Sequence, residues 1–152
     1  MNIFISLKAP RDDGDLRVAS LALAEAVRAA GHKPFVAWQE IEEKGLSPHQ
    51  FMPFVREHLR ACDLLLVLYH PELRGGLIEL GIAYAYGIPI WLAHRGEEQV
   101  SSSALGCVDL VLEYASLEDL QKKILDTLQS TAAIIVHHHE VKYFNIGESR
   151  TE

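Results

Sequence analysis

Residues 63–69, DLLLVLY, form an almost unbroken apolar run, and this run most limits the folds that are open to the chain. A strand with one face in water alternates apolar and polar residues, whereas a strand covered on both faces does not. Continuously apolar strands are typical of the centre of a parallel sheet that carries helices on both sides. We therefore expect an α/β fold built around this strand.

Other short apolar segments recur along the chain, separated by stretches with helical periodicity. We expect strands at residues 2–6, 33–38, 63–69, 89–93 and 107–114, and helices at about 15–30, 48–62, 77–87 and 117–130. Residues 39–46 are expected to form a loop. Parallel strands joined by helices require right-handed crossovers. The pattern predicts a flavodoxin-like, doubly wound three-layer sandwich with a five-stranded parallel sheet, in one α/β domain over residues 1–130.

The C-terminal segment, residues 131–152, does not follow this rhythm. Residues 132–144 are expected to form an extra strand, either on the sheet edge or exchanged with another subunit in a dimer. Within it, His137, His138 and His139 are adjacent. Because neighbouring strand residues point to opposite faces, one metal ion cannot easily use all three, and a solvated strand is the favoured interpretation.

Composition excludes several classes of function. With 152 residues, of which 49% are hydrophobic, the chain can bury one core, and its net charge of −7 argues against a nucleic-acid polymer as partner. No apolar run reaches the roughly 18 residues that span a bilayer, and no secretion signal is visible, so we expect a cytoplasmic protein without a membrane partner. Cys62 and Cys107 lie in apolar surroundings and are expected to be reduced.

A single acid, Glu79, lies within the otherwise apolar stretch LIELGIAYA that follows the expected central strand. Open α/β sheets place their binding clefts beyond the carboxyl ends of the strands. We expect Glu79 in the first turn of its helix, where the helix dipole and free N–H groups keep the carboxylate ionised. Such a group can attack an electrophilic carbon or stabilise one that gains positive charge. From the residues alone, a catalytic and a structural role are equally open.

Residues 62–92 resemble the core of the nucleoside 2-deoxyribosyltransferase family, which includes nucleotide N-glycosidases. The matching features are Asp63 at the start of the strand, Gly75-Gly76, the Glu-Leu-Gly-x-Ala motif at 79–83 and the Gly-x-Pro turn at 87–89. A weaker likeness extends over residues 2–125. The resemblance implies that Glu79 is the nucleophile that attacks the sugar C1′ of a nucleoside or its 5′-monophosphate and displaces the base. This chemistry requires no metal or organic cofactor.

Three positions depart from the family pattern. Phe4 stands where the first strand usually carries a Tyr that positions the nucleophile, and Leu7 stands where a Gly precedes the loop. Val55 stands where a helical Asp touches the sugar or assists proton transfer, and Glu57 lies on another face of that helix. Two consequences are open, a changed substrate specificity or a loss of catalysis.

The resemblance also indicates a phosphate site shared between subunits. In the family, a Ser-Ala element of a neighbouring subunit approaches the 5′-phosphate, which implies a homodimer or a higher homo-oligomer. The segment SSSALG, residues 101–106, follows Glu79 at a similar distance, and Ser103 matches best, with Ser102 next. The alternative is that these serines cap a short helix.

Further candidates for substrate binding come from the expected loops. Arg11 and Arg74 follow the first and third strands, and either can clamp a phosphate. Gly75 and Gly76 form the flexible turn before Glu79, and Trp38, at the end of the second strand, can stack on a base or pack at the rim.

Two alternatives remain open. Residues 2–6 and 30–69 are also similar to TIR domains, which implies a NAD glycohydrolase that uses a Glu in a similar place. The continuous segment ELGIAYAYGIP favours the deoxyribosyltransferase family. The missing Tyr and Asp suggest the other alternative, a nucleotide-binding or interaction domain without turnover.

Overall fold

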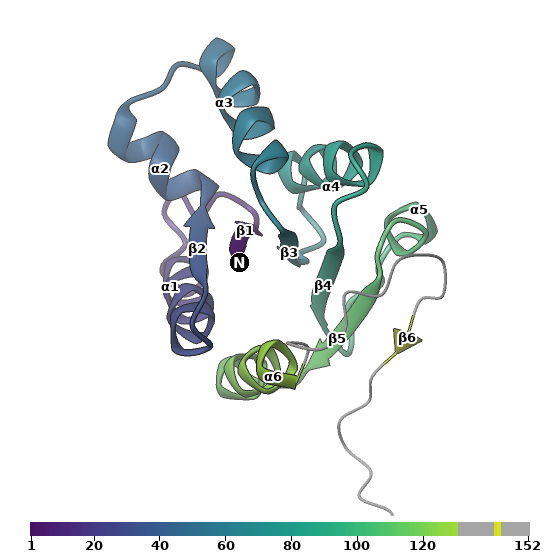
Figure 1. Ribbon diagram of the computed structural model, residues 1–152. Helices are drawn as coiled ribbons and strands as arrows, with labels where there is room; N and C mark the ends of the chain where they lie inside the picture. Colours follow the sequence, from purple (N-terminus) through teal and green to yellow (C-terminus); the bar gives the residue numbers. More distant parts are fainter. Residues whose placement is uncertain (131–141, 144–152) are drawn as a thin grey trace, which may run out of the picture.

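The computed structural model describes residues 1–130 and the pair 142–143 (Figure 1). Its elements are β1 (Asn2–Ser6), α1 (Gly14–Ala29), β2 (Lys33–Val36), α2 (Ala37–Lys44), α3 (Pro48–Arg60), β3 (Leu64–Leu68), α4 (Gly75–Ala85), β4 (Ile90–Arg95), α5 (Ser102–Leu105), β5 (Leu110–Tyr114), α6 (Leu117–Ser130) and β6 (Lys142–Tyr143). Strands and helices alternate as the sequence predicted, except that two helices, α2 and α3, separate β2 from β3.

The sheet is parallel throughout, in the order β2-β1-β3-β4-β5-β6. The chain moves outward in one direction from β1 to β2 and in the other from β3 to β5, so the order reverses between β1 and β3. This is the arrangement of a flavodoxin-like fold, and it confirms the predicted class. In such folds the crevice at the reversal point is the usual place for a ligand.

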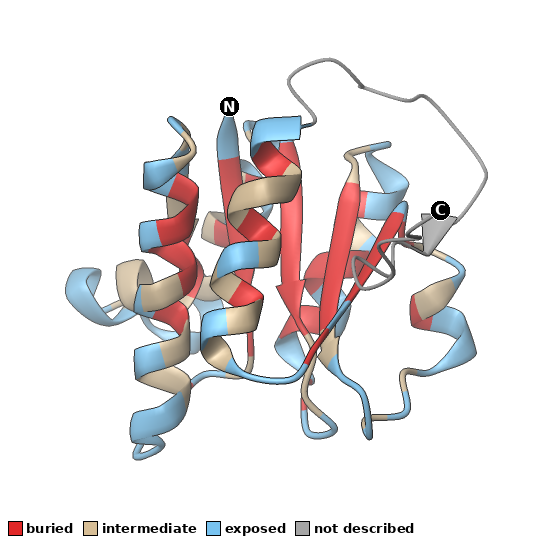
Figure 2. Ribbon diagram, turned by 90° about the horizontal axis from the view of Figure 1, so that it is seen from below, coloured by how far each residue is buried: buried red, intermediate tan, exposed pale blue. Residues whose placement is uncertain are grey.

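Helices cover both faces of the sheet and divide the core in two (Figures 1 and 2). On one face, α1 and α6 pack on a cluster that includes Ile3, Ile5 and Leu66. On the other face, α3 and α4 pack on a cluster that includes Phe4, Leu65 and Val67. All five residues of β3 are buried, as expected of a strand that is covered on both sides.

Helix α2 was not predicted, because residues 39–46 were expected to form a loop. The chain leaves β2 at Val36 and enters the helix at once, so Trp38 lies in α2 and not at the end of a strand. Glu and Lys residues are good helix formers, and Gly45 ends the helix in the left-handed conformation at φ 59°. The partly buried side chains of Trp38 and Ile41 attach α2 to the domain.

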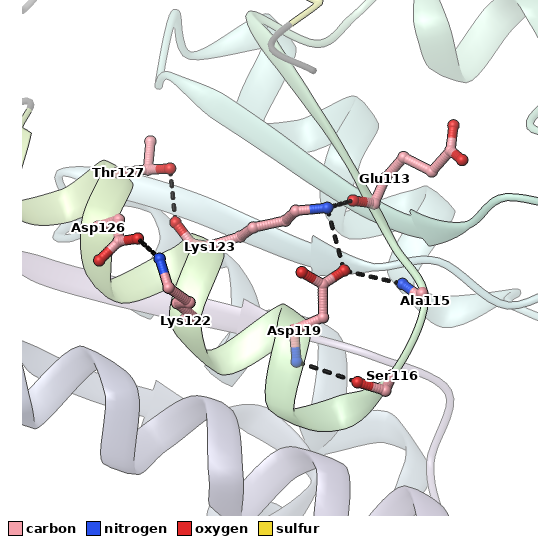
Figure 3. Close-up of polar contacts among 8 residues, drawn as sticks. All are labelled: Glu113, Ala115, Ser116, Asp119, Lys122, Lys123, Asp126 and Thr127. Carbon is pink, nitrogen blue, oxygen red and sulfur yellow. Dashed lines mark hydrogen bonds and ion pairs between the residues drawn. The ribbon is translucent and has the colours of Figure 1, made fainter. Parts of the chain in front are cut away.

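The predicted helix starts are largely confirmed. At the start of α3, the side chain of Gln50 accepts the N–H of Ser47 at 2.9 Å, and Pro48 is the first helical residue. Figure 3 shows the start of α6, where Ser116 Oγ accepts the N–H of Asp119 at 3.1 Å. The Asp119 carboxylate in turn pairs with Lys123 at 3.0 Å.

The expected C-terminal strand is described only at Lys142–Tyr143, where β6 pairs with β5 in parallel. The histidine run, His137 to His139, and most of the segment 131–152 lie outside the described residues. The proposed division at residue 130 and a role of the tail in a dimer therefore stay predictions.

Candidate active site

A cleft of about 990 Å³ opens at the carboxyl ends of β1 and β3. Its walls come from the loop after β1, from α2, from α3 and from the start of α4. Six of the residues selected from the sequence line it: Arg11, Trp38, Arg74, Gly75, Gly76 and Glu79. The cleft therefore lies at the point where the strand order reverses.

Glu79 is the buried acid of this cleft. Only 9% of its surface is exposed, and its Oε2 accepts a hydrogen bond from the hydroxyl of Ser6 at the end of β1. Burial raises the pKa of Glu79 to about 7, and the Ser6 hydrogen bond acts in the opposite direction. Burial penalises the charged form, whereas a donor stabilises it. Near neutral pH the carboxyl group is therefore close to its titration midpoint.

The position of Glu79 in its helix differs from the expectation. Helix α4 begins at Gly75, so Glu79 is its fifth residue and lies beyond the first turn. The free N–H groups and the favourable dipole effect are confined to the first turn. The prediction that the dipole holds Glu79 fully ionised was therefore wrong, and desolvation sets its protonation instead.

Gly76 lets α4 approach β1 closely enough for the Ser6–Glu79 contact. A Cβ at position 76 would lie 2.6 Å from Leu73 Cδ1 and 2.7 Å from Ser6 Oγ. Real Cβ atoms essentially never come this close to such neighbours, so no larger residue fits without displacement. At Gly75, by contrast, an added Cβ meets nothing within 4 Å.

Cationic side chains surround the cleft mouth. Lys8 pairs with Glu72, and the pKa of Glu72 is lowered chiefly by the hydrogen bond from Lys8. Arg11 lies in the loop after β1, and Arg74 is the residue just before α4. Both are exposed and line the cleft. Their positions agree with the loops expected from the sequence.

Arg17 of α1 ties the first loop to α2. Its Nε and Nη2 donate to the Arg11 carbonyl at 3.3 and 3.1 Å, and its Nη1 lies 3.4 Å from Glu42. Its guanidinium also lies 4.8 Å from the centre of the Trp38 ring. Arg11 has a positive φ of 40°, which a residue with a side chain rarely adopts, so these contacts help to hold the loop in shape.

Three other residues singled out in the sequence, Ser102, Ser103 and Phe4, do not line the cleft. Ser102 and Ser103 are exposed residues of α5 that do not line this cleft, and the cap of α5 is Ser101, whose Oγ accepts the N–H of Ala104 at 3.3 Å. Phe4 is fully buried and packs on Phe35, so it lies in the core.

Two residues in the site were missed from the sequence, Ser6 and Arg17. Asn2 and Ser6 are the two polar residues of the segment NIFIS, and Ser6 stands at its carboxyl end. Phe4 lies two positions before Ser6 on the same strand face. A polar residue at the carboxyl end of a buried strand is the signal that could have identified it. Arg17 gave no comparable signal, because two of its partners, Trp38 and Glu42, lie on the unpredicted helix α2.

Two negative results concern the described residues. In this part of the chain, no helix is long and apolar enough to cross a membrane. Nor do three or more His, Cys, Asp or Glu side chains in it gather as a possible metal site. Cys62 and Cys107 are free and partly buried, as expected, and burial raises the pKa of the Cys62 thiol to about 11.

Comparison with known proteins by sequence gives no match to a family model and none to a curated protein. Comparison of structures gives clear likenesses. The CMP N-glycosidase BcmB of Clostridium botulinum is 17% identical, with a TM-score of 0.64 over 82% of this chain and 98% of that one. A 2-deoxyribosyltransferase of Bacillus psychrosaccharolyticus is 20% identical, with a TM-score of 0.62 over 84% and 96%.

A third structure, a conserved protein from Enterococcus faecalis V583, is 17% identical, with a TM-score of 0.56 over 84% of this chain and 98% of that one. At these identities the likeness establishes the fold. The chain has the α/β fold of a deoxyribosyltransferase and of a nucleotide N-glycosidase, in agreement with the resemblance of residues 62–92. The likeness to TIR domains is not tested by these structures.

Proposed function

We propose that the protein cleaves or transfers at the N-glycosidic bond of a nucleoside or nucleoside 5′-monophosphate, with Glu79 as the nucleophile. The observation that carries this proposal is a buried carboxylate that lines a large cleft at the reversal point of the sheet. The two structures of the same fold that act on N-glycosides support it.

The chemistry suits one carboxylate in an apolar cleft. Breaking an N-glycosidic bond builds positive charge at C1′, and an anion on the face opposite the base lowers the barrier. Attack by Glu79 forms a glycosyl ester, which water resolves in a hydrolase and a second base resolves in a transferase. A pKa of about 7 leaves a substantial fraction of Glu79 ionised and competent to attack near neutral pH.

The sugar phosphate is assigned to the cleft mouth. Arg11 and Arg74 lie on loops that follow neighbouring strands, and a guanidinium binds phosphate through paired N–H donors. In this proposal the base lies deeper, between the apolar side chains of α2 and α3, and Trp38 borders it.

The proposal includes a homodimer. The outer face of α4 is apolar and open, with Leu77, Ile78 and Tyr84 exposed by 39%, 55% and 55%. Gly81 and Ala85 are exposed on the same helix, whose one acid, Glu79, points inward. A second copy packed on this face would lie directly behind the nucleophile, and it would cover the apolar surface that α4 leaves in water.

The decisive experiment is base release from a panel of deoxynucleosides, ribonucleosides, their 5′-monophosphates and NAD, followed by chromatography. Wild-type protein should release a free base, and Glu79→Gln should lower the rate on the order of 10³-fold or more. Glu57→Gln, which removes an exposed carboxylate of α3 outside the cleft, should release base at the wild-type rate. Equal release by wild type and Glu79→Gln, or none from any compound, would contradict the proposal.

A further inference from the structure

The cleft provides a nucleophile but lacks a partner acid in the place where one is expected. When C1′ is attacked, the base departs with the electron pair of the C1′–N bond. A neutral base then carries negative charge unless an acid protonates it, and such an acid typically contributes about 10²- to 10⁴-fold in rate. The helix position that could supply this acid holds Val55, which is 1% exposed and lines the cleft.

The other carboxylates of the cleft are already engaged or lie at its mouth. Asp13 accepts the N–H of Leu16 at 3.1 Å as the cap of α1. Glu42 pairs with Arg17 at 3.4 Å, and Glu72 pairs with Lys8. The hydrogen bond from Lys8 lowers the pKa of Glu72, so this carboxyl group is a poor proton donor.

Asp12 is the remaining acid, and it is exposed in the loop after β1. Among the lining residues that the structure describes, there is no histidine, tyrosine or cysteine that could replace an acid. The described cleft therefore has no buried proton donor besides Glu79, which cannot attack C1′ and protonate the departing base in the same step.

The walls make departure of an anionic base still less favourable. One side of the cleft is formed by α2, α3 and the turn between them. It is lined by four apolar and at least partly buried side chains, those of Ile41, Leu46, Met52 and Val55. An unpaired anion released among such groups loses its hydration without compensation. The same apolar surroundings favour the departure of a base that leaves without charge.

We infer that the substrates of this cleft are nucleotides whose base carries a positive charge before cleavage, such as N-alkylated purines and pyrimidines or N-ribosylated pyridinium rings. This inference rests on the proposed function and specifies its substrate class. Ionised Glu79 attacks C1′, the C1′–N bond breaks, and its electron pair neutralises the charge of the base, which departs without a proton. Water then attacks C1′ of the glycosyl ester, frees the Glu79 carboxylate and releases one proton.

The cleft also suits a cationic ring before it reacts. Glu79 lines the cleft, and so do the aromatic residues Phe51 and Trp38. Aromatic faces attract delocalised cations, and the guanidinium of Arg17 at 4.8 Å from the Trp38 ring shows such a contact within this cleft.

Matched substrates that differ by one methyl group test the inference. GMP is compared with 7-methylguanosine 5′-monophosphate, and CMP with 3-methylcytidine 5′-monophosphate near neutral pH, after subtraction of spontaneous release. In at least one pair, kcat/KM for the methylated compound should exceed that for its parent on the order of 10²-fold or more. Glu79→Gln should abolish the release from the methylated compound.

A variant that restores the acid separates leaving-group chemistry from binding. Val55→Asp should raise kcat on the unmethylated parent by about tenfold or more and leave kcat on the methylated compound unchanged. Val55→Asn is the matched control, since its amide has the shape of the Asp carboxyl group but no acidic proton, and it should give no such gain. Asp12→Asn should leave the wild-type preference unchanged. Circular dichroism establishes whether each variant folds. If Val55→Asp does not fold, the matched substrate pairs with the wild-type protein test the inference by themselves.

The outcomes separate the two proposals. Glu79-dependent release with parent and methylated compounds within tenfold of each other in both pairs would overturn the substrate class and leave the N-glycosidic function intact. Loss of the parent reaction in Asp12→Asn would also overturn it, because Asp12 would then be the acid. No Glu79-dependent release from any compound, the wider panel included, would contradict the function itself.

Discussion

The hydroxyl of Ser6 donates a hydrogen bond to Oε2 of Glu79, which joins the end of β1 to the second turn of α4. The two residues are 73 positions apart in the sequence and meet where the strand order reverses. Burial and this hydrogen bond act on the Glu79 carboxyl in opposite directions. The balance between them decides how much of Glu79 is ionised near neutral pH.

Removing the hydroxyl should therefore shift the pH dependence of activity. In Ser6→Ala the pKa of Glu79 rises further, so the acid limb of kcat/KM moves to higher pH. The rate at pH 7 should fall by about tenfold, because hydrogen bonds to charged groups contribute about 1.5–3 kcal/mol. Base release measured from pH 5 to 9 checks this. Ser20→Ala removes another buried hydroxyl, which bonds to the Arg17 carbonyl, and should keep the wild-type limb.

The pKa of Glu79 also predicts how stability depends on pH. The folded-state value of about 7 lies above the ordinary 4.5, so the folded protein keeps a proton that the unfolded chain has lost between these values. Stability should fall as pH rises from about 4.5 to 7 and stay low above that, by about 3 kcal/mol in total. Glu79→Gln should lack this loss in urea unfolding. If the free energies of unfolding of wild type and Glu79→Gln changed in parallel over pH 4–8, the raised pKa of Glu79 would be contradicted.

Two glycines of α4 should respond in opposite ways to the same change. Gly76→Ala places a methyl group against Leu73 and Ser6 and should destabilise the protein by about 1–3 kcal/mol. Gly81→Ala meets nothing within 4 Å and should stabilise the helix by about 0.5–1 kcal/mol. Thermal unfolding of both variants gives the comparison. A stabilised Gly76→Ala would mean that α4 can move away from β1.

The arginines at the cleft mouth should discriminate between nucleotides and nucleosides. Arg11→Met and Arg74→Met should each raise KM for a 5′-monophosphate by about tenfold, since a charge-assisted bond is lost. KM for the corresponding nucleoside should stay unchanged, and so should kcat. Arg28→Met, which alters an exposed arginine near the end of α1, is the control. Equal effects on both substrates would place the phosphate elsewhere.

The dimer is tested on the open face of α4. Ile78→Asp should weaken self-association measured by light scattering, because it places a charge in the proposed interface. Val18→Asp changes an equally exposed aliphatic residue on α1, 56% against 55%, and should leave the mass unchanged. Deletion of residues 131–152 tests separately whether the tail contributes. A monomeric wild type would contradict the proposed homodimer.

Much of the fold could be predicted from local pattern. The apolar run at 63–69 identified the buried central strand, and the spacing of apolar residues placed α1 and α6 to within a residue or two. Ser116 and Gln50 have the side chains that helix caps require, so both helix starts were predictable. Alternation of these elements then fixed the class, because parallel strands need crossovers of one hand.

The residues of the site could be predicted only where their neighbours in the sequence marked them. Glu79 stood out as an acid in an apolar stretch, but its depth in α4 depends on where that helix begins. Residues 39–46 contain three glutamates and only two apolar side chains, Ile41 and Leu46, too few to show a buried face. Helix α2 and the contacts of Arg17 with Trp38 were missed for this reason, since they depend on tertiary packing.

At the amino ends of the strands, away from the cleft, two aspartates make equivalent hydrogen bonds. Asp63 and Asn2 exchange hydrogen bonds at 2.7 and 2.8 Å, and Asp109 and Ile90 do the same at 2.8 Å in both directions. Each pair joins the first residue of one strand to the residue just before the neighbouring parallel strand. These bonds hold neighbouring strands in register at the end of the sheet away from the cleft. A substitution in the loops that line the cleft therefore leaves these anchoring bonds in place.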